Sequence, residues 1–151
     1  MAQAMSANTA SSTSQQRATG RSSIGLESGM SVETIATIRS GVSIEVLDDL
    51  KERLNSTDAN LSDIVRIPRR TLSRRRKEGQ LRPDESERVL RLLTVVRHAE
   101  EVMGSTEEAR KWMHEPNFAL ANETPLQFCD TGPGARRVDQ LLGQIEHGIS
   151  I

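Results

Sequence analysis

The stretch LSDIVRIPRRTLSRRRKEG, residues 61–79, decides the fold. Its first part, Leu61 to Val65, is predicted to be a short helix, and the turn Arg66-Ile67-Pro68 follows. Proline is disfavoured inside a helix but can open one, so a second helix is expected from Arg69 to Glu78, ending at Gly79. Two short helices joined by such a turn have the spacing of a helix-turn-helix motif.

The second of these helices is strongly basic. From Arg66 to Arg82 there are eight basic residues and one acid, Glu78, whereas the whole chain has a formal charge of −1. The remainder is therefore acidic. This separation of charge predicts one surface for a polyanion and another surface with a different role.

The helix-turn-helix spacing and the charge together favour a recognition helix that enters the DNA major groove, over a charged helix that is merely solvated. Leu72 should point inward and pack on Ile64 and Ile67. The last three basic residues of the helix are expected on phosphate. The predicted DNA-binding residues are Arg69, Arg70, Thr71, Ser73, Arg74, Arg75, Arg76 and Lys77.

Helical periodicity continues on both sides of this stretch, and no strand alternation is visible, so the fold class is predicted to be all-α. Asn55 to Asn60 is expected to be a polar connection, and Asp84 and Glu87 have capping-box spacing. The breaker cluster Thr131 to Gly134 should precede the last helix. The further expected helices are 31–39, 43–54, a long helix from the region of Asp84 to Met103, 105–114, 126–129 and 135–147.

The chain length of 151 residues suits about one domain, or a domain with a tail. Residues 1–28 are rich in small and polar residues and are predicted to be a disordered tail. A DNA-binding domain is expected over residues 29–103, and a second helical domain over residues 104–151. The boundary falls at Gly104, which should end the long helix.

Composition excludes several classes of function. Only 2 % of the residues are aromatic, which disfavours a single-strand nucleic-acid binder that stacks bases on rings. Cys129 is the one cysteine, so an internal disulfide is impossible and a reducing, cytoplasmic location is expected. No apolar run reaches about 18 residues, so no membrane span is predicted.

Nothing in the sequence predicts an enzyme. His98, His114 and His147 lie in different expected helices, without the spacing of a zinc-ligand pair. Cys129 has no neighbouring base and is expected in the core. Gly132-Pro133-Gly134 lacks the strand and the lysine of a phosphate loop. No catalytic residue, metal or cofactor is therefore expected.

Residues 70–93, RTLSRRRKEGQLRPDESERVLRLL, resemble the signature of the Xre/MbcA/ParS antitoxin family. KWMHEPNFAL (residues 111–120) and TPLQFCDTGPGARRVDQLLGQIEHGI (residues 124–149) are similar to the toxin-binding domain of that family, in the same order. The resemblance covers about Ser31 to Ile151. Two positions depart from the family: Arg82 replaces a small capping residue, and Ala121-Asn122 replaces a frequent glycine pair.

The resemblance implies an antitoxin whose partner is a RES-domain toxin, a class that depletes NAD⁺. It implies that the C-terminal domain covers the active site of the toxin, that the helix-turn-helix represses the operon through operator DNA, and that the protein forms a homodimer. The residues expected to contact the toxin are Trp112, Asn117, Leu120, Leu126, Thr131, Gly134, Arg136, Val138 and Ile149. Trp112 and Leu126 could instead belong to the core. Two alternative functions stay open: a stand-alone transcriptional regulator and a polar-positioning scaffold.

Overall fold

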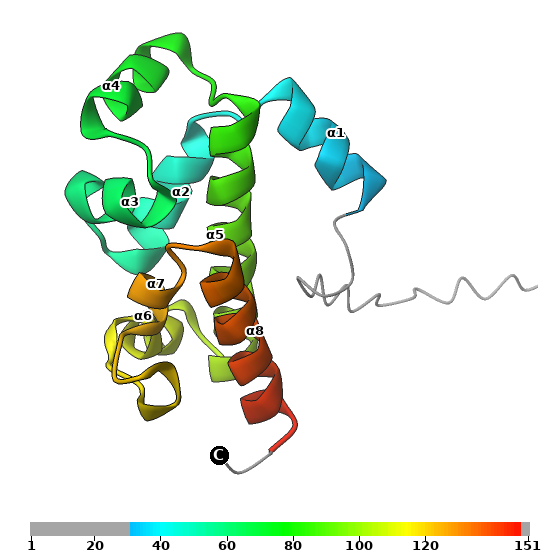
Figure 1. Cartoon of the computed structure of the whole chain (residues 1–151), viewed down its shortest axis with the longest axis vertical. Helices are drawn as coiled ribbons and strands as arrows, with labels where there is room; N and C mark the ends of the chain where they lie inside the picture. Colours follow the sequence, from blue (N-terminus) through cyan, green and yellow to red (C-terminus); the bar gives the residue numbers. More distant parts are fainter. Residues whose placement is uncertain (1–30, 149–151) are drawn as a thin grey trace, which may run out of the picture.

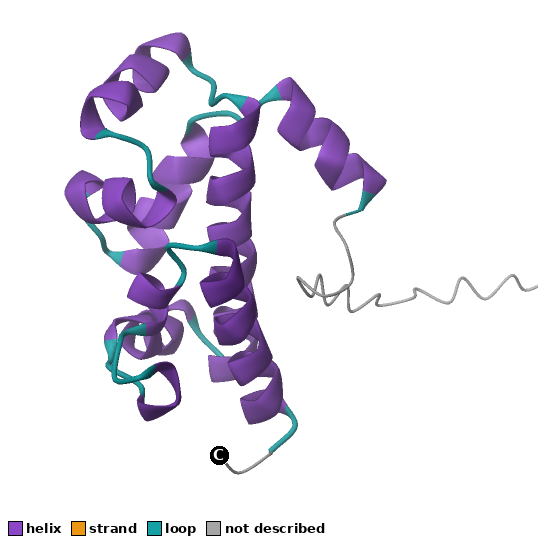
Figure 2. Cartoon of the chain, in the orientation of Figure 1, coloured by secondary structure: helices purple, strands orange, loops and turns teal. Residues whose placement is uncertain are grey.

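The computed structural model describes residues 31–148, and within that range the fold is helical, as predicted (Figure 2). The predicted tail at residues 1–28 lies outside the described residues. One isolated antiparallel bridge, Ser43 to Gln80, ties the start of the second helix to the end of the fourth. The elements in chain order are α1 Val32–Ser40, α2 Glu45–Leu54, α3 Asp58–Val65, α4 Arg69–Glu78, α5 Pro83–Met103, α6 Thr106–His114, η1 Phe118–Leu120, α7 Pro125–Phe128 and α8 Gly132–Glu146.

Helices α2, α3 and α4 form one half of the molecule, around the predicted helix-turn-helix. Helix α2 buries Leu47, Leu50 and Leu54, whose spacing of three and four residues places them on one face. Helix α3 ends at Arg66, which takes a left-handed conformation. Gly79 ends α4 in the same conformation, as the sequence predicts.

The long helix α5 is the central element of the fold. It is buried on more than one side, because α1, α2, α3, α6 and α8 all pack against it (Figure 1). The buried apolar residues form one cluster that runs from Ile44 in the first half to Leu142 in the second. The two predicted domains therefore share a helix and a core.

The C-terminal half consists of α6, η1, α7 and α8. The broadest helix–helix contact in the molecule lies between α8 and α5, where Val138, Leu141 and Leu142 are buried. Helix α7 is a single turn with Thr124 as its cap and Pro125 at its first position, as predicted. In Figure 1 this half lies at the opposite end of α5 from α4.

Several predicted helix starts are wrong, among them Ser43 for α2, which begins at Glu45. Helix α3 begins at Asp58, because the Thr57 side chain accepts a hydrogen bond from Asn60 N (3.2 Å) and converts the expected connection into helix. Helix α5 begins at Pro83, and Glu85 accepts from Arg82 N (2.9 Å), so Asp84 and Glu87 do not form the cap. Helix α8 begins at Gly132, with the expected breaker cluster forming its first turn.

Helix α1 differs from the others because no residue in it is buried. Ser31 caps it and Gly41 ends it, as predicted. Its apolar side chains Val32 and Ile35 face solvent, Val32 with 84 % of its surface exposed.

Candidate DNA-binding and partner-binding surfaces

The turn between α3 and α4 is fixed by buried side chains and by hydrogen bonds to its backbone. Leu72 and Ile67 are buried in one cluster with Val65, which confirms that Leu72 points inward. Ser62 Oγ donates to Ile67 O (2.6 Å), and Arg88 Nε donates to Val65 O (2.8 Å). These contacts satisfy carbonyl groups at the end of α3 and set the direction of α4.

Arg75 was expected on phosphate, and the structure corrects this prediction. The residue is only 2 % exposed. Its Nε and Nη2 donate to Glu85 Oε2 and Oε1 at 2.7 and 2.9 Å, and its Nη1 donates to Glu78 Oε2 at 3.0 Å. Two parallel hydrogen bonds to a buried carboxylate fix α4 on α5.

The environment of this buried pair keeps both groups charged. The hydrogen bond with Glu85 raises the pKa of Arg75, although burial opposes it. Burial disfavours the charged form of Glu85, but hydrogen bonds from Arg75 and from the Arg82 amide outweigh burial and hold the pKa of Glu85 below its usual value.

Arg76 also has a positioning role. It donates to Asp48 and, at 2.8 Å, to Asp58 Oδ1. The hydrogen bond with Asp48 raises the pKa of Arg76, against the effect of partial burial. Lys51 adds a second cation at 3.2 Å from Asp58 Oδ1. These groups hold α4 against the starts of α2 and α3, so the structure does not place Arg76 among the free cations.

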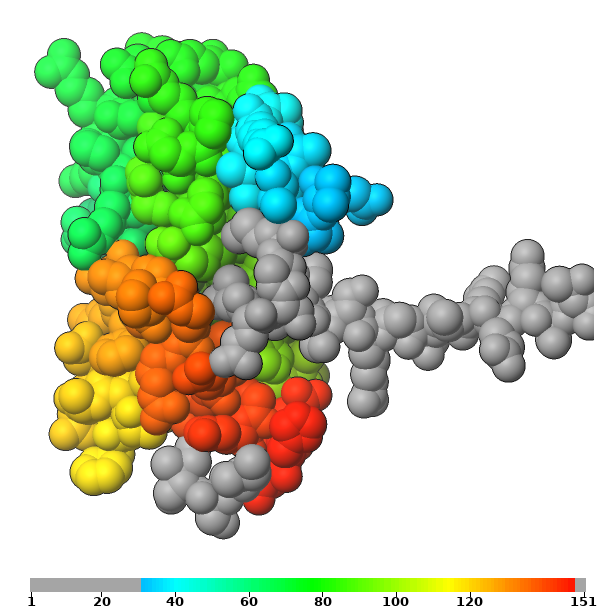
Figure 3. All heavy atoms as spheres, turned by 45° about the vertical axis from the view of Figure 1, so that its right-hand side comes forward, coloured from blue at the N-terminus to red at the C-terminus, as the bar shows by residue number. Residues whose placement is uncertain are grey.

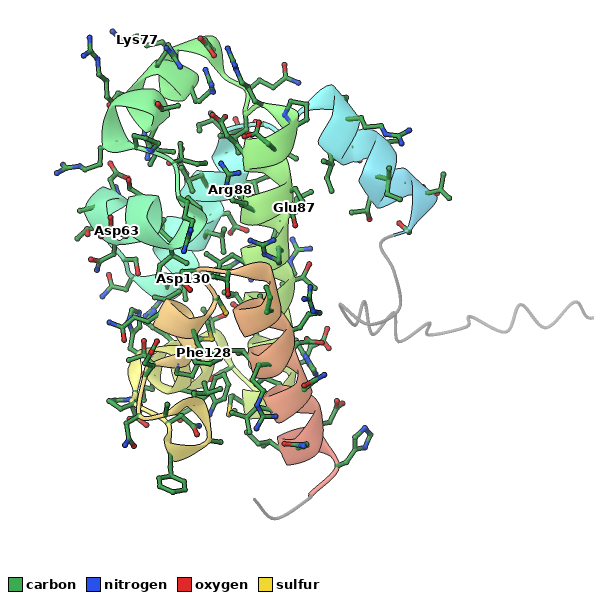
Figure 4. All side chains as sticks on the ribbon, viewed as in Figure 1. Asp63, Lys77, Glu87, Arg88, Phe128 and Asp130 are labelled. Atoms are coloured by element: carbon green, nitrogen blue, oxygen red, sulfur yellow. The ribbon has the colours of Figure 1, made fainter. Side chains whose placement is uncertain are left out.

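A free polar edge of α4 remains. Arg69, Arg70, Ser73, Arg74 and Lys77 are exposed, and Thr71 is half-buried. Within residues 31–148, no ion pair engages Arg69, Arg70 or Lys77, and the Arg74 contact with Glu78 is long (3.9 Å) and solvent-exposed. Figure 4 shows Lys77 at the outer end of the helix. This edge can accept phosphates or base edges without breaking internal contacts.

Four residues expected to contact a toxin are buried instead. Buried residues support the fold, so the structure gives these positions a packing role. Gly134 is buried for a specific reason: a Cβ there would lie 1.8 Å from Phe128 O, so only glycine permits α8 to start this close to α7. The four are Leu120, Leu126, Gly134 and Val138.

The other expected contact residues are distributed as follows. Arg136 is exposed, and Thr131 is exposed while its hydroxyl accepts from Gly134 N (3.1 Å) as the α8 cap. Trp112 and Asn117 are half-buried. Ile149 lies outside the described residues. Phe118, which is not among the predicted residues, is 89 % exposed.

Side chains of α6 join the two halves by capping the end of α2. Arg110 donates to Arg53 O (2.9 Å) and Glu52 O (3.1 Å), and His114 Nε2 lies 2.8 Å from Leu54 O. The last carbonyls of α2 have no partner within their own helix, so these contacts satisfy them. A second link, Arg66 to Asp130 at 3.6 Å, connects the helix-turn-helix turn to the segment just before α8.

The residues considered for catalysis are buried or paired with other side chains. Cys129 is buried in the core, as expected, and burial raises the pKa of its thiol to about 12. His98 pairs with Asp139 at 2.7 Å. No group of three or more metal-ligating side chains occurs within residues 31–148. None of the helices described here is long and apolar enough to cross a membrane.

The fold and its surfaces define a class: a helix-turn-helix protein that carries a second helical unit on a shared central helix. Comparisons with known proteins agree with this division. Residues 33–93 match the antitoxin Xre-like helix-turn-helix domain, and residues 98–148 match the antitoxin Xre/MbcA/ParS C-terminal toxin-binding domain. The two matches meet within α5.

Individual proteins extend the comparison. The chain is 32 % identical to antitoxin Xre of Yersinia enterocolitica, over 83 % of this chain and 86 % of the relative. It is 31 % identical to antitoxin Xre of Photorhabdus laumondii over the same shares. A chain of the crystal structure of the M. tuberculosis MbcT-MbcA toxin–antitoxin complex matches with a TM-score of 0.54 and 25 % identity, over 72 % of this chain and 96 % of that chain. This chain belongs to the Xre/MbcA/ParS family of antitoxins.

Proposed function

We propose that this antitoxin neutralises a toxin encoded beside it and represses its own operon. The toxin would be of the RES type, which consumes NAD⁺ in the cytoplasm, and the C-terminal half would cover its active site. The observation that carries the proposal is the match of residues 98–148 to a toxin-binding domain. The match to a chain from a toxin–antitoxin complex supports the same interpretation.

Repression of the operon is supported by the free edge of α4. Arg69, Arg70 and Lys77 are exposed and lack internal ion pairs within the described chain, whereas Arg75 and Arg76 fix the helix from behind. A rigid helix with free cations on one side suits major-groove binding. Phosphate contacts would make the affinity for the operator fall with salt.

A homodimer is part of the proposal. Helix α1 carries exposed apolar side chains, Val32 and Ile35, that a second copy would cover. A two-fold dimer would present two α4 helices to a palindromic operator. Light scattering on purified wild type and Val32→Asp tests this point: a monomeric wild type, or a variant that stays dimeric, contradicts dimerisation through α1.

The experiment that tests the proposed function is co-expression with the neighbouring reading frame. That frame alone should stop growth and lower cellular NAD⁺, and the full-length antitoxin should restore both. A neighbouring product that is harmless alone, or toxic in the presence of the antitoxin, contradicts neutralisation. Toxicity without NAD⁺ loss contradicts only the RES assignment.

A further inference from the structure

Phe118 is the most exposed large hydrophobic residue in the described part of the chain, at 89 % exposed. It opens the short turn η1 within the segment 115–123 that joins α6 to α7. A single exposed aliphatic residue is ordinary on a protein surface. An exposed aromatic ring on a fixed turn is less common, because an aromatic ring contributes much binding or folding free energy when it is buried.

The backbone around Phe118 is held by a compact set of hydrogen bonds. Asn117 Oδ1 accepts from Ala119 N (2.9 Å), and Asn117 O accepts from Leu120 N and Asn122 N (both 3.0 Å). Asn117 N donates to Glu123 O (3.0 Å), which closes the segment. Asn117 is thus the residue that organises the turn.

Burial on the other side of the turn adds to this rigidity. Leu120 is 1 % exposed and anchors the turn in the core, two residues beyond the exposed ring. Ala121 and Asn122 follow in the left-handed region, with φ of 55° and 63°. Non-glycine residues take this conformation at a cost. The turn therefore presents the ring of Phe118 in a fixed place instead of folding it inward.

We propose that Phe118 is the aromatic anchor of the toxin interface and inserts into an apolar pocket on the toxin surface. This inference rests on the proposed function. A pre-positioned aromatic side chain loses little conformational entropy on binding, and such residues dominate binding energies at interfaces. Phe118 lies within residues 98–148, the part that matches a toxin-binding domain.

The surroundings of Phe118 favour a protein over a nucleic acid. The segment 115–123 contains two acids, Glu115 and Glu123, and no basic residue, so a phosphate backbone would be repelled. The segment lies at the end of the molecule far from α4 (Figures 1 and 3). In the proposed homodimer, the second copy covers the apolar side of α1. Phe118 is not part of that interface and stays available for the toxin.

The test measures binding of full-length wild type, Phe118→Ala and Phe118→Tyr to the purified product of the neighbouring reading frame. Phe118→Ala should weaken binding by at least about 30-fold, and Phe118→Tyr should retain most of the affinity. Arg97→Ala is the control: it truncates an exposed side chain of α5 that lies in neither proposed protein interface, and it should leave toxin affinity unchanged. Thermal unfolding should be the same for all four proteins, because Phe118 packs against little of the fold.

The outcomes separate this inference from the proposed function. Wild type that binds the toxin, with Phe118→Ala equally tight, overturns the anchor and leaves the proposed function intact. Wild type that does not bind overturns both. A loss of dimer mass in Phe118→Ala assigns the ring to a second copy, and a loss of operator affinity assigns it to DNA; either result overturns the inference.

Discussion

Arg74 and Arg75 are adjacent in the chain, yet one faces solvent and the other is buried beside Glu85. Successive residues on a helix point about 100° apart, so neighbours on α4 have different environments. Arg75 follows Leu72 by three residues and shares its inward face. That spacing was the signal in the sequence that could have assigned Arg75 to the core.

The acidic partner of Arg75 was harder to predict. Glu85 lies on a different helix, ten residues away, and its contact with Arg75 depends on how α4 crosses α5. The basic residues of α4 point to nearly every side of the helix. Charge alone therefore could not separate the cations predicted to bind DNA from those that hold the helix in place. Of the predicted DNA-binding set, the structure leaves the exposed edge from Arg69 to Lys77 as the candidate surface.

Replacement of Arg69 and Arg74 by alanine should weaken operator binding by roughly 1–3 kcal/mol for each contact that reads a base. Both side chains are exposed, so unfolding should be unaffected. The measurement is a DNA titration with the operator at two salt concentrations. Lys111→Ala on α6 is the matched control, since it removes an exposed cation from the other half of the molecule. Equal weakening by Lys111→Ala would contradict the role of α4.

His98 is a further residue whose charge stabilises the fold. Its Nδ1 lies 2.7 Å from Asp139 Oδ1 and its Nε2 lies 3.6 Å from Glu146 Oε2, so it joins α5 to α8. The hydrogen bond with Asp139 raises the pKa of His98, with burial opposing and the charge of Glu146 assisting.

Because the folded protein holds this proton more tightly than the unfolded chain, the added stability is fully present below the unfolded pKa of about 6.5. It is lost as pH rises through the raised pKa of the folded state. The melting temperature of wild type should therefore fall more steeply with pH above about 6.5 than that of His98→Gln. Parallel curves for the two proteins would contradict a charged His98–Asp139 pair.

At the scale of elements, most helices were predictable because their apolar residues recur at spacings of three and four. The ends of α1, α4 and α5 followed from glycines, which take a positive φ at all three positions. The start of α8 was not predictable, because Gly132, Pro133 and Gly134 have the composition of a loop. The Thr131 cap and the close approach of Gly134 to Phe128 O keep these residues in the helix.

The predicted toxin-contact residues divide between the surface and the core. Residues that a family shares can serve its fold as well as its partner, and sequence similarity does not separate the two. Leu120, Leu126 and Val138 were selected for this reason and lie in the core. Phe118 follows no periodic pattern, and its exposure depends on the turn that Asn117 organises.

The contact of α8 with α5 should dominate the stability of the C-terminal half. Leu142 is fully buried on α8, and its replacement by alanine should lower the free energy of unfolding by about 2–5 kcal/mol. Ile145, three residues further on the same helix, is 36 % exposed and is the matched control. Ile145→Ala should cost less than about 1 kcal/mol. Urea denaturation of the two variants measures the difference, and equal losses would contradict the packing described here.

The same contact means that deleting the C-terminal half is a poor test of function. Removal of α7 and α8 would uncover the apolar face of α5, which also supports α2 and α3. Single substitutions on the surface separate the two activities without this damage.

At the scale of the whole molecule, the free edge of α4 and the segment around Phe118 lie at opposite ends of α5 (Figure 1). The halves are nevertheless connected, since Arg110 and His114 on α6 cap the end of α2. Because the two surfaces are separate, we expect one antitoxin to bind toxin and operator at the same time.

The most direct measurement is the mass, by light scattering, of purified full-length antitoxin mixed with the neighbouring toxin and operator DNA. We expect one species that contains all three components. Separate toxin–antitoxin and antitoxin–DNA species, with no ternary complex at saturating concentrations of all three, would contradict simultaneous binding through two separate surfaces.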